Sequence, residues 1–228
     1  MSDPRQLPLT FPEPELDFED MALTGANRAA IAAAKRIEHW PYTTFCVVGP
    51  KRSGLTTLVK AWVRLFQGAE LDAALAAVSQ PEDLERIAGG CVAIDRADLV
   101  TDDGRLLALV SAVERLNGRL LCTALTPPAD WKTGMSPDLM SRLKSAPIAR
   151  IDDPDEEMMR ARLQRAAGRC VLTLSKNVED YLVLRLGLSY LAIEETVQRL
   201  AGAAGSRALT VPLAKDVLEH DSTTGAGE

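Results

Sequence analysis

The sequence lacks any run of about 18 consecutive apolar residues, so we expect no helix that spans a membrane and no membrane partner. Residues 1–14 are rich in proline and lack the basic start and apolar core of a secretory signal, which favours a cytoplasmic protein. Histidine is scarce, with only His39 and His220, and the four cysteines form no Cys-x-x-Cys pair. We therefore expect no histidine-based metal site and no histidine-dependent catalytic triad.

The sequence also lacks an excess of positive charge. It carries 26 lysines and arginines against 32 acidic residues, a formal net charge of −6 over 228 residues. This balance argues against a protein that coats nucleic acid, although it leaves room for a local basic groove. A hydrophobic share of 46% with 25% charged residues is typical of a soluble globular protein, and the length suits one large domain with or without a small lid.

Short apolar segments alternate with helical patterns through the first two thirds of the chain. The patterns predict strands at residues 43–48, 91–95, 119–124 and 147–151. They predict helices at residues 27–39, 55–67 and 104–116, and another helix that ends at 88. This alternation is the signature of an α/β fold, in which a parallel sheet carries helices on both faces.

The pattern changes after Pro154, where four helical segments follow one another at residues 155–167, 178–186, 191–201 and 211–219. Asp153, with Glu156 three residues later, predicts the capped start of the first helix. The arginines at 160, 162, 165 and 169 indicate a solvated helix face. We expect four regions: a flexible tail over 1–20, an α/β core over 21–152, an all-helical lid over 153–220, and a disordered tail over 221–228.

A phosphate-binding loop is predicted between the first strand and the helix that follows it. Residues 49–56 match the Walker A frame Gly-x4-Gly-x-Thr, whose backbone wraps a phosphate at the start of a helix. The candidate nucleotide-binding residues are Gly49, Pro50, Lys51, Arg52, Ser53, Gly54, Leu55 and Thr56. Leu55 occupies the position of the phosphate-binding lysine, while Thr56 stands where a magnesium-binding hydroxyl belongs. A plain strand–turn–helix corner is the alternative interpretation.

A further candidate, Asp95, closes an apolar strand in the manner of a Walker B motif. The next position normally holds the glutamate that activates water, but here it is Arg96, and a cation cannot accept that proton. We expect weak binding of ADP or ATP, Mg²⁺ only together with nucleotide, and little intrinsic ATP hydrolysis. An ATPase in which Lys51 stands in for the missing lysine is the alternative.

These motifs are followed by a strand that ends in Pro127-Pro128 and then by the segment Asp138-Leu139-Met140-Ser141-Arg142-Leu143. Their order resembles the AAA+ module of the bacterial initiator DnaA, and more closely the short DnaA-related regulators of the Hda or HdaA family. The resemblance covers residues 15–220. It implies a P-loop AAA+ fold with a helical lid, and it implies that Arg142 is an arginine finger that acts on nucleotide held by DnaA. A surface arginine without that role is the alternative.

The N-terminal segment Gln6-Leu7-Pro8-Leu9-Thr10-Phe11 resembles the hexapeptide with which bacterial proteins bind the sliding clamp of DNA polymerase. The amide of Gln6 suits directional hydrogen bonds, the leucines and Phe11 suit apolar pockets, and Pro8 lowers the entropy lost when an extended peptide is ordered. The candidate clamp-binding residues are Gln6, Leu7, Leu9 and Phe11. The alternative is that these side chains fold back over the domain.

Together these resemblances imply an adaptor that binds the DNA polymerase III sliding clamp (β) and promotes ATP hydrolysis by DnaA, so that it negatively regulates replication initiation. No sequence-specific contact with DNA is expected, because the chain after the lid is too short for the helix-turn-helix of DnaA. A homodimer remains open. The alternatives are a self-contained ATPase, an interaction module without an arginine finger, and a helicase-loader-like protein, which the acidic net charge disfavours.

Overall fold

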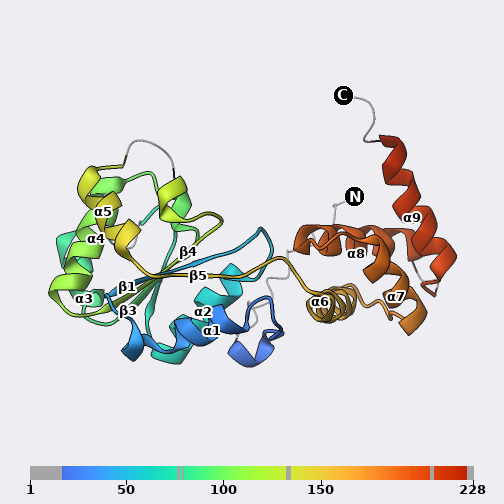
Figure 1. Ribbon diagram of the computed structural model, residues 1–228, viewed down its shortest axis with the longest axis horizontal. Coiled ribbons are helices and arrows are strands. Elements are labelled where there is room, and N and C mark those ends of the chain that lie inside the picture. The colour runs from blue at the N-terminus through green and yellow to red at the C-terminus, as the bar shows by residue number, and fades with distance from the viewer. Residues whose placement is uncertain (1–16, 76–77, 79, 132–134, 206–207, 225–228) are drawn as a thin grey trace, which may run out of the picture.

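The computed structural model describes residues 17–75, 78, 80–131, 135–205 and 208–224 (Figure 1). Within these ranges the centre is a parallel sheet of five strands in the order β2-β3-β4-β1-β5. The strands are β1 (Thr44–Val48), β2 (Ala69–Leu71), β3 (Cys91–Ile94), β4 (Arg119–Ala124) and β5 (Ile148–Arg150). The predicted fold class, a parallel α/β sheet followed by a helical region, is confirmed.

Helices cover both faces of the sheet (Figure 1). One face carries α1 (Arg28–Lys35) and α2 (Leu55–Phe66), and the other carries α3 (Pro81–Ile87), α4 (Asp103–Arg115) and α5 (Pro137–Ser145). Short 3₁₀ turns connect these elements: η1 (Phe18–Asp20), η2 (Ile37–His39), η4 (Ala97–Leu99) and η5 (Pro128–Asp130). Because β1 lies between the two layers, all of its residues are buried.

Alternate residues of β1 enter the two helical layers. Cys46 and Val48 belong to the apolar cluster beneath α3, α4 and α5, whereas Val47 belongs to the cluster beneath α1 and α2. In the second cluster the rings of Trp40 and Trp62 stack with their centroids 5.9 Å apart. This packing fixes α2 against the sheet, so the loop that precedes α2 is held at a defined place.

Four helices follow β5, and we call them the lid: α6 (Glu156–Arg169), α7 (Lys176–Arg185), α8 (Tyr190–Ala204) and α9 (Val211–Thr224). They bury an apolar cluster of their own, which includes Leu163, Leu182, Val197 and Ala214. Figure 1 shows the lid at the opposite end of the molecule from α4 and α5. Hydrogen bonds join the lid to the core at the loop after β1, where Arg162 donates to Arg52 O, and at the segment before α1, where Asp155 accepts from Ala26 N.

Three predicted helix boundaries were wrong, and one of them is the end of the last helix, since α9 runs to Thr224 and not to residue 219. The helix predicted over residues 27–39 is interrupted, because α1 ends at Lys35 and Arg36 leaves the helical conformation before η2 begins. The N-cap of α6 is Asp155 and not Asp153, since the Asp155 carboxylate accepts a hydrogen bond of 2.7 Å from Met158 N. That carboxylate also accepts a hydrogen bond of 3.2 Å from Ala26 N, a tertiary contact for which the local sequence holds no signal.

We expect Asp155→Ala to lower the free energy of unfolding by about 1 kcal/mol, the typical value of an N-cap, whereas Asp153→Ala removes only an exposed side chain. Burial acts to raise the pKa of the Asp155 carboxyl. Hydrogen bonds from Met158, Thr24 and neighbouring backbone N–H groups lower it by more than burial raises it, so the pKa lies below its ordinary value. Its contribution is therefore present at neutral pH and is lost as the pH falls through the lowered pKa. Urea unfolding at neutral and acidic pH measures both effects, and equal midpoints for the two variants would contradict this assignment.

Two elements, β2 and α5, were not predicted. β2 has three residues, of which only Leu71 is buried, so its sequence shows no alternation. α5 begins with Pro137 in its first turn, where proline is tolerated because the N–H that it lacks has no helical partner. In the part of the chain that the structure describes, no helix is long and apolar enough to cross a membrane. Within the same ranges, no three histidine, cysteine or acidic side chains are grouped to hold a metal ion.

Candidate nucleotide-binding site

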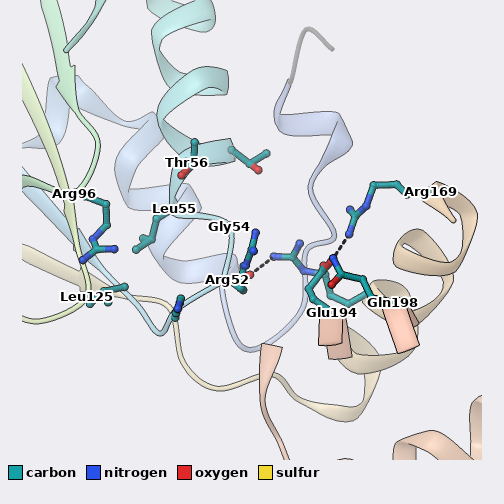
Figure 2. A pocket seen from close by; sticks show the side chains of 12 residues that line it. Arg52, Gly54, Leu55, Thr56, Arg96, Leu125, Arg169, Glu194 and Gln198 are labelled. Carbon is teal, nitrogen blue, oxygen red and sulfur yellow. Dashed lines mark hydrogen bonds and ion pairs between the residues drawn. The ribbon is translucent and has the colours of Figure 1, made fainter. Parts of the chain in front are cut away.

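A cavity of about 510 Å³ lies between the loop after β1 and the lid helices α6 and α8 (Figure 2). Its wall is formed by Lys51, Arg52, Gly54, Leu55, Thr56, Thr57, Arg96, Leu125, Arg162, Arg169, Glu194 and Gln198. Five of these residues are cationic and one is acidic, although the whole chain carries a net negative charge. The cavity lies beyond the carboxyl end of β1, where open parallel sheets bind ligands, and its charge suits an anion.

Two positions of the loop, Gly54 and Gly49, require glycine, the first for its backbone conformation and the second for lack of space. Gly54 has a φ of 105°, in the region that side chains avoid, and α2 begins immediately after it. A Cβ on Gly49 would lie 2.8 Å from Ser53 Oγ. The N–H of Gly49 donates a hydrogen bond of 3.2 Å to Ala124 O, which ties the loop to β4. Gly54 and the first residues of α2 line the cavity, so the N-terminus of α2, whose first N–H groups have no helical partner, borders it as in an anion-binding loop.

A hydroxyl and a carboxylate meet beside this loop. Thr56 Oγ1 donates a hydrogen bond of 2.7 Å to Asp95 Oδ2, and Thr123 Oγ1 donates one of 2.7 Å to Asp95 Oδ1. Oxygen ligands of this kind suit Mg²⁺ when it is bound together with phosphate groups. The structure thus brings Asp95 next to the loop of residues 49–56, and Thr56 and Asp95 would hold the metal ion of a bound nucleotide.

The groups that hydrolysis needs are replaced by side chains with other contacts. Leu55 is 6% exposed and packs in the apolar cluster beneath α1 and α2. Arg96 donates two hydrogen bonds of 2.9 Å to Asp98, and this pairing raises the pKa of its guanidinium. Leu55 cannot donate a hydrogen bond to a phosphate, and Arg96 cannot accept a proton from water. The cationic wall therefore suits an anion such as a phosphate group, but the position of the water-activating glutamate holds a side chain that cannot take up a proton.

Arg142 lies on α5, away from this cavity. β5 follows α5 and runs parallel to β1, so the carboxyl end of α5 lies at the edge of the sheet opposite the phosphate loop. Arg142 Nε donates a hydrogen bond of 3.0 Å to Asp138 Oδ1, and Nη1 donates to Glu114 Oε2. These two carboxylates raise the pKa of Arg142. The candidate finger is thus charged and partly exposed, and it is separated from the chain's own candidate nucleotide site.

Sequence reasoning assigned all the arginines of α6 to a solvated face, and this was wrong for Arg162. Arg162 Nη2 donates a hydrogen bond of 3.1 Å to Arg52 O, and Cζ lies 5.4 Å from the centre of the Tyr190 ring. The helical period contained a signal, because Arg162 lies one turn from Met158 and one turn from Ala166, and both of these are buried.

The four candidate clamp-binding residues, Gln6, Leu7, Leu9 and Phe11, lie outside the described residues. Clamp binding therefore stays a prediction from the sequence.

No protein-family model matches this sequence, and no curated protein sequence matches it. Solved structures do match. Domain III of the replication initiation protein DnaA from Thermotoga maritima is similar with a TM-score of 0.73 at 14% identity, over 92% of this chain and 98% of that one. AMPPCP-bound DnaA from Aquifex aeolicus gives 0.69 at 17% identity, over 94% and 71% of the two chains. The RuvB Holliday junction branch migration motor of Thermotoga maritima gives 0.65 at 16% identity, over 91% and 72%. At these identities the likeness establishes the architecture alone: this chain has the fold shared by domain III of DnaA and the RuvB motor.

Proposed function

We propose that this chain is a cytoplasmic adaptor that regulates DnaA. It binds the sliding clamp through Gln6, Leu7, Leu9 and Phe11, presents Arg142 to ATP that is held by DnaA, and promotes hydrolysis of that ATP. The observation that carries the proposal is that the candidate nucleotide site and Arg142 lie at different places in the fold. The chain's own candidate site lacks the groups for hydrolysis, while Arg142 lies at the other side of the core, where it can serve another chain. The DnaA-like fold supports the choice of partner.

Arg142 is oriented for such a role by its neighbours. Asp138 and Glu114 occupy Nε and Nη1, and among the described residues Nη2 has no partner, so it can donate a hydrogen bond to a phosphate oxygen. An arginine finger acts by stabilising the charge that develops on the transferred phosphoryl group, and it need not itself exchange a proton. Because the paired carboxylates raise its pKa, the guanidinium stays charged throughout the reaction.

A reconstituted assay tests the proposal. With clamp loaded on DNA, the chain is expected to accelerate the conversion of DnaA-bound ATP to ADP by on the order of tenfold or more. The same preparation without DnaA is expected to hydrolyse ATP no faster than buffer, since Leu55 and Arg96 replace the two groups that turnover needs. The measurement is the ratio of labelled ATP to ADP recovered on DnaA over time, with free clamp as the control.

Two outcomes would contradict the proposal in different ways. Robust ATP turnover by the chain alone, eliminated by Lys51→Ala, would favour a self-contained ATPase, because Lys51 lines the cavity. Binding to DnaA with no change in the lifetime of its ATP would favour an interaction module.

A further inference from the structure

We infer that Arg162 of the lid is the residue that binds the phosphate groups of a ligand in the cavity, in place of the lysine that is absent at Leu55. The ligand class is a diphosphate group, either free or as part of a nucleoside diphosphate. The inference rests on the proposed function, because it names the ligand of the chain's own candidate site. It assigns to the first lid helix a role that its charge pattern does not suggest.

The position of Arg162 is the first support. Its Nη2 lies 3.1 Å from Arg52 O and 3.1 Å from the place that a Cβ on Gly54 would take. Arg52 and Gly54 lie side by side on the loop in Figure 2. The Arg162 guanidinium therefore lies beside the loop backbone that would wrap a phosphate. It extends from the lid helix α6, whereas a Walker A lysine would extend from the start of α2. It offers a planar set of donors suited to two phosphate oxygens.

The charge on Arg162 is not matched by a carboxylate. Two other cations of the cavity wall form ion pairs, Arg96 with Asp98 and Arg169 with Glu194. Among the described residues no acidic group lies within 4 Å of the Arg162 guanidinium, which contacts a backbone carbonyl and an aromatic ring instead. Burial lowers the pKa of Arg162, even though Glu194 at longer range opposes this effect. A bound anion would supply the compensating charge that the chain does not.

Tyr190 fixes the approach of Arg162. It opens α8, its ring lies under the guanidinium, and its hydroxyl donates a hydrogen bond of 3.3 Å to Asp152 O at the junction of core and lid. Burial raises the pKa of Tyr190 to about 12, so the hydroxyl stays protonated and keeps this bond at neutral pH. A ligand bound by Arg162 is therefore coupled to the position of the lid.

A buried hydroxyl is the independent sign of a ligand. Ser53 is 1% exposed, and its Oγ has no hydrogen-bond partner among the described residues. It lines a small cavity of about 20 Å³ together with Gly54, Thr57 and Arg162. That volume holds about one water molecule and is too small for a nucleobase. The adjoining cavity of about 510 Å³ has room for a ligand, and none of the residues described on its wall is aromatic, so the phosphate groups are the part that is recognised.

Calorimetric titration of the full chain with ADP and with inorganic pyrophosphate, each with Mg²⁺, tests the inference. We expect wild-type binding to be weakened on the order of 10- to 100-fold by Arg162→Ala, because a charge-assisted hydrogen bond is lost. Arg162→Lys keeps the positive charge but loses the planar set of donors of the guanidinium, so it should bind both probes with intermediate affinity. Binding of pyrophosphate as well as ADP identifies the diphosphate as sufficient, while binding of ADP alone identifies a nucleoside diphosphate, and both results support the inference.

Arg185→Ala is the matched control, because it removes a lid cation that lies over the Tyr181 ring and outside the cavity wall. It should bind both probes as the wild type does. Equal affinity of Arg162→Ala and wild type would overturn the inference, and so would a wild type that binds neither probe. Unfolding midpoints show whether each variant is folded. If Arg162→Ala does not fold, Arg162→Lys still tests the inference, because equal affinity of the lysine variant and wild type would then overturn it. The DnaA assay does not enter this test, so the two proposals can fail separately.

Discussion

Arg142→Ala is expected to return the lifetime of DnaA-bound ATP to the value of DnaA alone, even with clamp and DNA present. An arginine finger supplied by another chain is worth on the order of 10³ to 10⁵ in rate. Arg142 suits this role because two carboxylates bind its Nε and Nη1, and no described residue binds its Nη2. Single-turnover hydrolysis on DnaA, measured beside clamp affinity, separates loss of the finger from loss of the complex.

Lys144→Ala is the matched control for this experiment. Lys144 is an exposed cation two residues further along α5, so it points to another side of the helix, and its removal should leave the stimulation intact. Arg142→Lys keeps the charge but not the planar fork, and we expect it to remain largely inactive. Full stimulation by Arg142→Ala, with clamp binding unchanged, would remove the arginine finger from the proposal and leave an interaction module.

The sheet could be predicted from the sequence because most of its strands are apolar runs that end at turns. β1 and β4 match their predicted ranges within one residue, since central parallel strands are buried on both faces and every residue carries the signal. β2 could not be found in this way. Its three residues pair with β3 at the edge of the sheet, and the pairing, not the composition of β2, makes it a strand.

The candidate site could be predicted only where it is local. Residues 49–56 are contiguous, so their motif is visible in the sequence, and Asp95 is marked by the strand that it follows. Arg162 lies 110 residues from Arg52, and their hydrogen bond depends on how the lid packs on the core. On charge alone α6 has the pattern of a solvated helix, and the sequence signal for Arg162 is weaker, namely its place one helical turn from the buried residues Met158 and Ala166.

Replacing Gln6, Leu9 and Phe11 together with alanine is expected to lower affinity for the sliding clamp on the order of 100-fold or more. Each apolar anchor contributes about 1.5 to 3 kcal/mol when it is fully buried, and the glutamine amide adds hydrogen bonds of about 1 kcal/mol. Thr10→Ala is the matched control, since Thr10 lies between two anchors and supplies no apolar group of its own to a pocket. Surface plasmon resonance with immobilised clamp measures all the variants.

The same variants decide whether these side chains instead cover the domain. If Leu9 and Phe11 pack on the chain's own surface, the triple variant lowers the unfolding midpoint and leaves clamp affinity unchanged, which would contradict the docking interpretation. If they bind the clamp, affinity falls and the midpoint stays where it is, because the replaced side chains then contribute nothing to the folded core. Each interpretation thus predicts a change in the quantity that the other leaves constant.

Clamp binding and the arginine finger also differ in how they respond to concentration. A clamp-bound adaptor gains an effective concentration near DnaA without any new contact to the reacting phosphate. Loss of Gln6, Leu9 and Phe11 should therefore be compensated in the DnaA assay when the chain is added in large excess. Arg142→Ala should not be compensated at any concentration, because the missing guanidinium acts in the transition state and not in the encounter. A tail variant that excess protein fails to rescue would show that the tail does more than hold the adaptor in place.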